Sequence, residues 1–203
     1  MPTLFTTPRT WAAYEPVTKN LLNTYVRNQF LSVSFLSTRF VTTDTSLASV
    51  TLNLPTSSQA THCEIHVYAR GEAAGTGLLA QLGSTGAVYF WELNRFAGPT
   101  GSTATAAAND TAWTVGNIPS VGGSTSDMAY TKLLLPEHNN TRAYKTFISQ
   151  SAAFLSSAST SGFVNHFAGT VPSPNPLTVI TFIPSGAGNV FSIGCEFSVY
   201  GMP

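Results

Sequence analysis

The sequence predicts a mainly β protein, in which an antiparallel β-sandwich or jelly-roll-like domain follows an extended N-terminal arm with one short helix. Two patterns predict this fold class. From about residue 46, apolar and polar residues alternate with a period of two, and turn-forming Gly, Pro, Asn and Ser residues separate the alternating stretches. We therefore assign residues 1–45 to the arm and residues 46–203 to the sandwich, which is long enough to bury one hydrophobic core.

The arm contains the one convincing helical pattern of the sequence. Its apolar residues at helical spacing are Val17, Leu21, Leu22, Tyr25, Val26 and Phe30. Thr18 is a suitable N-cap, and Val17 and Leu22 then take the two positions of a hydrophobic staple. We expect a helix over about residues 19–31. Because a helix this short is marginal in water, it needs a packing partner, either the chain's own β domain or another subunit.

Period-two alternation marks the strands of the sandwich. It is clearest over residues 62–70 and 191–200, which read as half-buried strands. Further strands are expected over residues 49–54, 78–82, 88–93, 112–118, 129–135, 144–149 and 178–183. The glycine-rich stretches at 71–77 and 83–86 lack the ending of a phosphate-binding loop, so we interpret them as hairpin turns.

The chain has few charges, and they cancel. Charged residues make up 9% of the sequence, with nine basic and nine acidic residues. This balance argues against a nucleic-acid partner, and a low net charge gives little repulsion between copies. The arm is nevertheless basic, because Arg9, Lys19, Arg27 and Arg39 stand against Glu15 alone within residues 1–40.

The sequence offers no pattern for a membrane, a leader or a cofactor. It has no run of about 20 apolar residues, and its start lacks the basic and apolar regions of a secretion signal, so we expect a protein made and kept in a cytoplasm. Cys63 and Cys195 lie far apart without CxxC spacing. We expect both thiols to be buried as small hydrophobic groups, with no disulfide, zinc or other cofactor.

One cluster has the residue types of a metal site. His62, Glu64 and His66 would share one face of a strand, but the two histidines would lie roughly 13 Å apart, too far for one ion. We expect cross-strand polar pairing on a solvent or subunit face instead. No nucleophile elbow and no spaced pair of carboxylates is present, so we predict no catalytic residues and no enzyme activity.

Aromatic residues in or beside the strands suggest a further alternative. These residues are Tyr68, Tyr89, Trp91, Trp113 and Tyr130. On an exposed face they could stack on sugar rings, whereas the more common role of strand aromatics is core or interface packing.

Two segments resemble a known group of proteins. Residues 7–18, TPRTWAAYEPVT, and residues 21–28, LLNTYVRN, resemble the opening of many tailed-bacteriophage virion proteins, which share R-T-W, V-T and L-N-x-x-x-R-D-N/Q in that order. This chain has Asn28 where Asp is common and Tyr14 where Gly is common. The stretches 177–183 and 191–201 resemble the β-sandwich domain of the same proteins.

The resemblance implies a noncatalytic component of a tailed-phage particle: a capsid decoration (cement) protein, a head fibre or a tail-tip protein. We favour cement, because the chain lacks the long repetitive shaft of a fibre. The alternative is a tail-tip or fibre protein that binds a host-surface glycan or receptor through long polar loops at 98–110 and 119–127. The expected location is the capsid exterior or the tail, after assembly in the cytoplasm of the host bacterium.

The arm is the expected docking element, with the major capsid protein or other virion proteins as partners. Its expected docking residues are Arg9, Trp11, Leu21, Leu22, Tyr25, Arg27 and Phe30. The apolar residues would bury surface, and the basic residues would face an acidic surface, which makes attachment sensitive to salt. The resemblance also implies a homotrimer. We expect it to be held through the β domain, since so little charge leaves much uncharged surface for contact.

Overall fold

The computed structural model describes residues 35–43, 47–56, 60–72, 76–83, 89–97, 101–110, 112–119, 127–155, 161–186 and 188–202. These residues form antiparallel strands in two sheets and contain no helix, which confirms the predicted mainly β sandwich. The helix expected over residues 19–31 lies outside the described residues. The strands are β1 (Phe35–Val41), β2 (Val50–Asn53), β3 (His62–Ala69), β4 (Thr76–Leu82), β5 (Tyr89–Ala97), β6 (Gly101–Asp110), β7 (Trp113–Ile118), β8 (Ala129–Leu135), β9 (Lys145–Leu155), β10 (Ser161–Val171), β11 (Val179–Pro184) and β12 (Glu196–Met202).

The strand order is that of a jelly roll with two added hairpins. The eight-stranded sheet has the order β1-β12-β3-β8-β9-β10-β5-β6, and the four-stranded sheet has the order β2-β11-β4-β7. Without the hairpins β5–β6 and β9–β10, the two sheets have the orders β1-β12-β3-β8 and β2-β11-β4-β7, and each successive strand lies in the other sheet except that β7 follows β4 in the same one. These two four-stranded orders are the jelly-roll arrangement.

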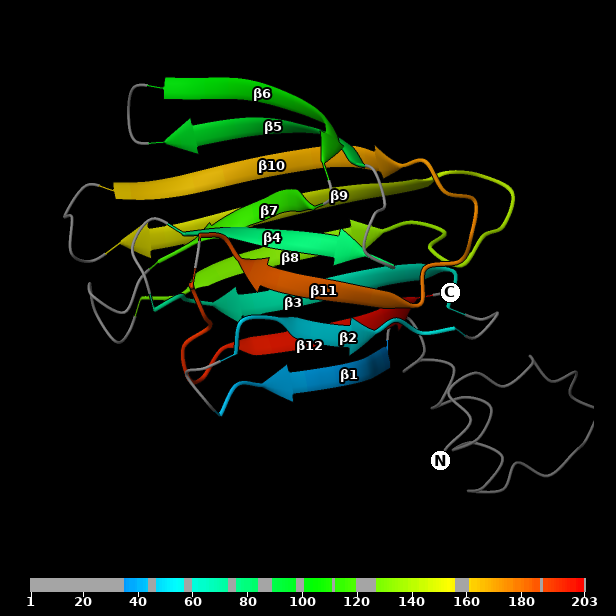
Figure 1. Ribbon diagram of the computed structural model, residues 1–203, viewed down its shortest axis with the longest axis horizontal. Coiled ribbons are helices and arrows are strands. Elements are labelled where there is room, and N and C mark those ends of the chain that lie inside the picture. The colour runs from blue at the N-terminus through cyan, green and yellow to red at the C-terminus, as the bar shows by residue number, and fades with distance from the viewer. Residues whose placement is uncertain are drawn as a thin grey trace, which may run out of the picture.

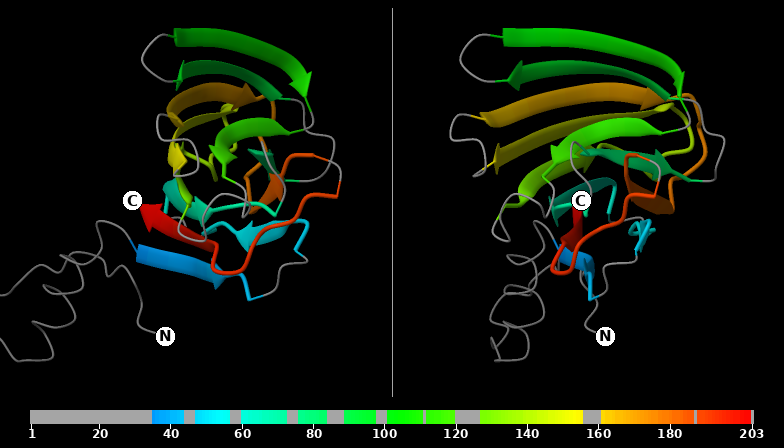
Figure 2. Two further views of the ribbon diagram at one scale, coloured as in Figure 1. Left: turned by 90° about the vertical axis from the view of Figure 1, so that its left-hand side faces the viewer. Right: turned by 60° about the vertical axis from the view of Figure 1, so that its left-hand side comes forward.

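Both added hairpins lie at the same edge of the eight-stranded sheet. Strand β10 pairs with β9 on one side and with β5 on the other, and β6 pairs with β5. The four-stranded sheet ends at β7, which contacts β8, β9 and β10. In Figures 1 and 2, β5 and β6 therefore extend beyond the smaller sheet.

The core lies between the two sheets and is filled by buried residues that alternate with less buried ones along strands such as β2, β3, β8 and β11. Trp113 of β7 is fully buried and packs on Phe147 of β9, with ring centroids 4.3 Å apart. At the β12 side of the core, Phe197 contacts Phe182 and Phe191, with centroids 5.5 and 5.1 Å away. Burial of such side chains stabilises the fold by about 25 cal/mol per Å² of apolar surface removed from water.

The two sheets approach closely where β7 crosses β8 and β9. Gly116 of β7 lies against Thr131 and Ser151, so that a Cβ added at this glycine would come within 2.6 Å of Thr131 Oγ1. The buried hydroxyls there are satisfied: Thr131 donates to Ser151 Oγ at 3.0 Å, and Ser149 donates to the Val115 carbonyl at 3.2 Å. A residue without a side chain is therefore needed at position 116.

Most of the expected strands are present. The strand expected over residues 129–135 has the same bounds as β8, and those at 49–54, 78–82, 88–93, 112–118 and 178–183 overlap β2, β4, β5, β7 and β11. Expected turn residue Gly83 has a positive φ of 73°, which suits a turn after β4. Both cysteines are buried and free, as expected.

Several of the predicted strand boundaries were wrong. Residues 101–110, expected in a polar loop, form strand β6, and β9 continues to Leu155 instead of ending at 149. Strand β10 was not predicted at all. The last strand begins at Glu196 rather than 191, because Gly194 takes a φ of 82° and breaks the extended chain.

The range 1–45 assigned to the arm includes one strand of the sandwich. Residues Phe35–Val41 form β1, which pairs with β12 at one edge of the larger sheet. The remainder of the expected arm, residues 1–34, lies outside the described residues.

Candidate functional site

The outer face of the eight-stranded sheet, which points away from the core, is the candidate site. Register places its residues in rows that run across the strands. One row contains Val41, Glu196, Tyr68, Tyr130, Ala152 and Val164. The next row contains Arg39, Ser198, His66, Lys132, Gln150 and His166. A third row contains Tyr200, Glu64, Leu134, Ile148 and Ala168. We call the three rows together the outer face.

Four aromatic rings lie side by side near the centre of the outer face. Tyr68 and Tyr130, on neighbouring strands, have ring centroids 4.9 Å apart. The His66 ring lies 5.7 Å from that of Tyr130 and 5.1 Å from that of Tyr200. Tyr68 is 46% exposed, which is high for so large an aromatic residue in the middle of a sheet.

A chain of hydrogen bonds links the polar groups among these rings. Tyr130 Oη lies 2.8 Å from His66 Nδ1, and His66 Nε2 lies 2.6 Å from Glu64 Oε1. Lys132 Nζ completes the chain at 2.7 Å from Glu64 Oε2. Every donor meets an acceptor when the imidazole carries its proton on Nε2, because the phenol then donates to Nδ1. The expected cross-strand polar pairing is therefore confirmed for Glu64 and Lys132.

The surroundings shift the pKa values of Glu64 and Tyr130 in opposite directions. Burial alone would raise the pKa of the Glu64 carboxyl, but hydrogen bonds from Lys132 and His66 outweigh it and lower that pKa. Burial, followed by the nearby Tyr68 and Glu64, raises the pKa of the Tyr130 phenol. At neutral pH the network thus holds a carboxylate beside an ammonium, and Tyr130 keeps its proton.

The Tyr130–His66–Glu64 connectivity has the order of a nucleophile, a base and an orienting carboxylate. An activated phenol would need a lowered pKa, whereas that of Tyr130 is raised. The raised pKa of Tyr130 therefore does not fit the nucleophile's place in this order.

His62 is not part of this network. Its Nδ1 accepts a hydrogen bond from the backbone N–H of Glu137 at 3.2 Å, in the turn after β8. Among the described residues, no group of three or more His, Cys, Asp or Glu side chains is arranged to hold a metal ion. Likewise, none of them forms a helix that is long and apolar enough to cross a membrane.

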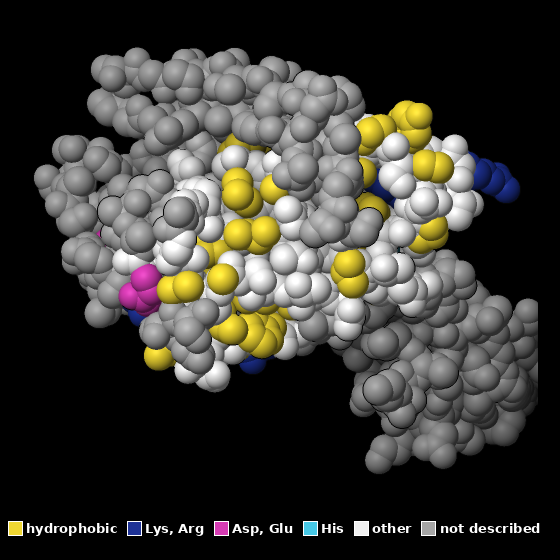
Figure 3. Space-filling view, in the orientation of Figure 1, with side chains coloured by type: hydrophobic (Ala, Val, Ile, Leu, Met, Phe, Trp, Pro, Cys, Tyr) yellow, Lys and Arg dark blue, Asp and Glu magenta, His cyan; other side chains and the backbone are white. Residues whose placement is uncertain are grey.

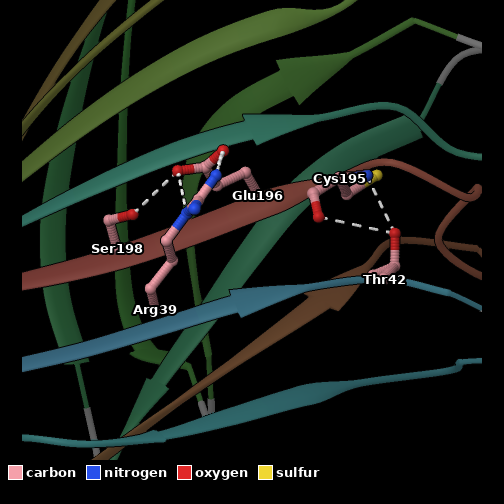
Figure 4. A network of polar contacts seen from close by, with 5 residues as sticks. All are labelled: Arg39, Thr42, Cys195, Glu196 and Ser198. Carbon is pink, nitrogen blue, oxygen red and sulfur yellow. Dashed lines mark hydrogen bonds and ion pairs between the residues drawn. The ribbon is translucent and has the colours of Figure 1, made fainter.

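The edge strand β1 is fixed to β12 by side chains as well as by the backbone pairing of the two strands. Arg39 donates from Nε and Nη2 to the two Glu196 carboxylate oxygens at 2.8 and 2.9 Å, and Ser198 donates to the same carboxylate at 3.2 Å (Figure 4). The hydrogen bond from Arg39 is the main reason that the pKa of Glu196 is lowered. A bidentate pair of this kind fixes the geometry more firmly than a single contact does.

Thr42, the residue after β1, makes buried hydrogen bonds that fix the end of the strand. Thr42 Oγ1 accepts a hydrogen bond from the Cys195 N–H at 2.8 Å (Figure 4). The same hydroxyl donates to the Ser192 carbonyl at 2.6 Å. The Thr42 N–H donates to the Cys195 carbonyl at 2.9 Å. Strand β1 is therefore held at both its middle and its end.

The face of the four-stranded sheet looks different. In Figure 3, where this sheet faces the viewer, the described side chains are mostly uncharged, and the few charged ones lie toward the margins. Thr51 and Thr181 share a hydrogen bond of 2.9 Å between β2 and β11 on this side. It carries no aromatic network like that of the outer face among the described residues.

The structure divides the predicted site residues into three groups. The expected docking residues Arg9, Trp11, Leu21, Leu22, Tyr25, Arg27 and Phe30 all lie outside the described residues. Of the aromatic set, Tyr68 and Tyr130 are neighbours on the outer face, but Trp113 is buried in the core and cannot meet a ligand there. Tyr89 and Trp91 belong to β5, where only the backbone is described.

Sequence reasoning missed Tyr200, Lys132 and the Arg39–Glu196 pair. The alternation of the last strand placed Tyr200 on its polar side, and this was the available signal. Nothing in the sequence indicated which strands are neighbours, so the contacts between them were not predictable.

Comparison with models of known protein families gave no match, and comparison with curated proteins gave none either. Among solved structures, the chain is similar to the CBM2 module of the evolved Dit of Lactobacillus casei BL23 phage J-1, with 13% sequence identity and a TM-score of 0.13. The match covers 76% of this chain and 69% of that one. A TM-score this low carries no conclusion about the fold or the ligand of the present chain.

Proposed function

We propose that this chain is a noncatalytic structural protein of a tailed-phage virion, namely a capsid decoration protein that binds the assembled shell through its N-terminal arm. The observation that carries the proposal is the R-T-W, V-T and L-N-x-x-x-R pattern of residues 9–27, directly followed by a jelly-roll sandwich. The basic, apolar arm supplies the contact with the major capsid protein or another virion protein, and the sandwich projects outward.

Strand β1 gives this attachment a rigid link. Any pull on the arm would act on the sandwich at Phe35, the first residue of β1. From there it passes to β12 through the ladder, the Arg39–Glu196 ion pair and the Thr42–Cys195 contact. Because β12 lies next to β3 within the larger sheet, the arm is coupled to the body of the domain.

The function of a decoration protein is thermodynamic. A copy that binds only the assembled shell stabilises it, since the free energy of binding is lost when the shell opens. A homotrimer would offer three arms to one lattice point, and simultaneous binding raises the apparent affinity above that of a single arm. Such binding requires shell subunits that are already in register.

Variants of the full chain test the role of the arm. Leu21→Asp combined with Leu22→Asp places two charges on the apolar side of the expected helix, and we expect few copies to join the particles. Thr24→Asp, on the opposite side of that helix, is the control and should join normally. Attachment should also weaken as salt rises, because exposed charge pairs are screened over about 8–10 Å at ordinary ionic strength. Normal incorporation of the double variant would contradict anchoring by the arm.

A second candidate is a tail-tip or fibre protein that binds a host-surface glycan. The exposed ring of Tyr68 beside Tyr130 favours it, because aromatic faces can stack on sugar rings. A phage with this gene deleted separates the two roles. If the chain is a decoration protein, particles without it should have normal shape, release DNA at a lower temperature and adsorb normally. Particles of unchanged heat resistance that fail to adsorb would overturn the decoration role.

A further inference from the structure

We propose that the outer face is covered by further copies of the same chain, so that the face around Tyr68, Tyr130 and Tyr200 is the interface of a homo-oligomer. This inference goes beyond the proposed function, because it names the face through which copies of the chain meet, and it competes with the glycan candidate for that face.

Apolar side chains gather on this face. Four of its residues are large, apolar and well exposed: Val41, Tyr68, Ile148 and Val164 are between 40% and 47% exposed. Partly buried Tyr130 lies beside Tyr68 in the first row, and partly buried Leu134 and Tyr200 lie in the third row with Ile148, on the other side of the polar second row. Single exposed apolar residues are ordinary, but several on one sheet face are typical of a binding surface.

The size of the face suits contact with another subunit. Six strands from β1 to β10, spaced about 4.8 Å apart, span about 24 Å, and seven residues of β8 extend about 23 Å. The resulting footprint of roughly 550 Å², before side-chain relief is counted, approaches the ~800 Å² that each partner buries in a stable interface.

The charges of the outer face favour a second copy as the partner. When identical surfaces meet about a symmetry axis, like charges approach each other and unpaired ones repel. Here Arg39 is paired with Glu196, and Lys132 with Glu64, within one chain. Each copy therefore presents a locally neutral surface. A partner selected by opposite charge would instead need charges that the chain leaves unpaired.

The same contacts argue against a sugar as the occupant. A sugar site combines an aromatic surface with polar groups that are free to bind hydroxyls. Among the described residues beside Tyr68, the Tyr130 phenol, both His66 nitrogens and both Glu64 oxygens already have partners. A sugar would have to break this chain, whereas the apolar side chains of another copy can pack over it.

The first test measures the mass of the full chain in solution by sedimentation velocity. We expect an oligomer. Tyr68→Arg should raise its dissociation constant at least tenfold, because the contact would have to bury an added cation. Tyr144→Arg is the matched control, since Tyr144 is 62% exposed but lies in the connection between β8 and β9; it should leave the mass unchanged. A monomeric wild-type chain, or a Tyr68→Arg variant of unchanged mass, would overturn the proposal.

The second test asks what covers the face. Cys63 and Cys195 are buried, and burial raises the pKa of both thiols, that of Cys63 to about 12, so background labelling by maleimide is low. Gln150→Cys places a thiol on the outer face, and Asn175→Cys places one on an exposed loop as the control. We expect Gln150→Cys to be protected, and more so as protein concentration rises, while the control reacts freely.

The other occupants give different results in the same test. Cover by residues 1–34 of the same chain would protect Gln150→Cys at every concentration. A face left open for a glycan would let it react as fast as the control. Either result would overturn the proposal. Because both variants replace exposed residues, the fold should survive, and equal thermal melting curves confirm it.

Discussion

The ammonium of Lys145 donates a hydrogen bond to the carbonyl of Pro174, 3.2 Å away, and thereby joins two connections at one end of the sandwich. The same Nζ also donates to the Ala143 carbonyl at 2.9 Å and to that of Asn140. Lys145 is only 2% exposed, and burial lowers the pKa of its ammonium. Three carbonyls satisfy a cation that would otherwise be costly to bury.

Lys145→Met should destabilise the protein by about 3 kcal/mol, because three backbone carbonyls lose their hydrogen bonds to a charged donor. Arg142→Met removes an exposed cation from the same connection and should change stability by less than about 0.5 kcal/mol. Urea unfolding of both variants measures the difference. Equal losses of stability in the two variants would show that the hydrogen bonds of the Lys145 ammonium do not stabilise the fold.

Thr42→Val keeps the shape of the side chain but removes its hydroxyl. The buried Cys195 N–H then loses its acceptor and the Ser192 carbonyl loses its donor, so we expect a loss of about 2 kcal/mol. Thr43→Val, at an exposed position one residue later, is the matched control. A thermal melt compares them, and a stable Thr42→Val variant would contradict the role of this contact in fixing β1.

Gly116→Ala tests the close approach of the two sheets. The new methyl would overlap Thr131 Oγ1 and the hydroxyl of Ser151, so β7 would have to move away from β9. We expect a loss of about 1–3 kcal/mol, as in other overpacked cores. The free energy of unfolding in urea checks this value. An unchanged free energy would mean that the sheets are farther apart at β7 than the structure places them.

Stability should fall in acid. Glu64 and Glu196 both have pKa values below the ordinary 4.5, because Lys132 and His66 bond the first carboxylate and Arg39 the second. The folded state therefore binds these protons less tightly than the unfolded state does. Their stabilisation is complete above pH 4.5 and is lost as the pH falls through the folded values.

Melting temperatures measured between pH 7 and pH 3 test this expectation. Glu64→Gln should flatten the acid limb of the curve more than Glu196→Gln, since the carboxylate of Glu64 is the less exposed of the two, at 20% against 33%. A wild-type curve that stays level through this range would show that neither carboxylate stabilises the fold through its charge.

Alternation predicted a strand well where its residues are strong strand formers. Strand β3 alternates His62, Glu64 and His66 with buried Cys63 and Ile65, and its bounds were predicted within one residue. Strand β6 has the sequence GSTATAAAND, whose small residues have weak strand preference, so it read as a loop. It forms a strand because β5 pairs with it along its length, and that pairing is tertiary information.

The outer face was predictable only strand by strand. Period two places Glu64 and Tyr68 on one side of β3, but the Lys132 ammonium that binds Glu64 comes from β8. Likewise, Arg39 and Glu196 are 157 positions apart in the chain. Such contacts follow from the jelly-roll strand order, which local patterns do not encode. The sequence thus predicted which residue types would face outward and missed their partners.

The pairing of Phe35 with Gly201 places the first and last strands of the sandwich side by side with their outer ends together. A reporter fused after residue 203 would consequently crowd the start of β1, where the proposed arm joins the sandwich. Ile193, in the turn that precedes β12, is 51% exposed and lies at the opposite end of that strand. A dye attached there would leave the start of β1 unobstructed, so position 193 is the better handle for testing the proposed attachment.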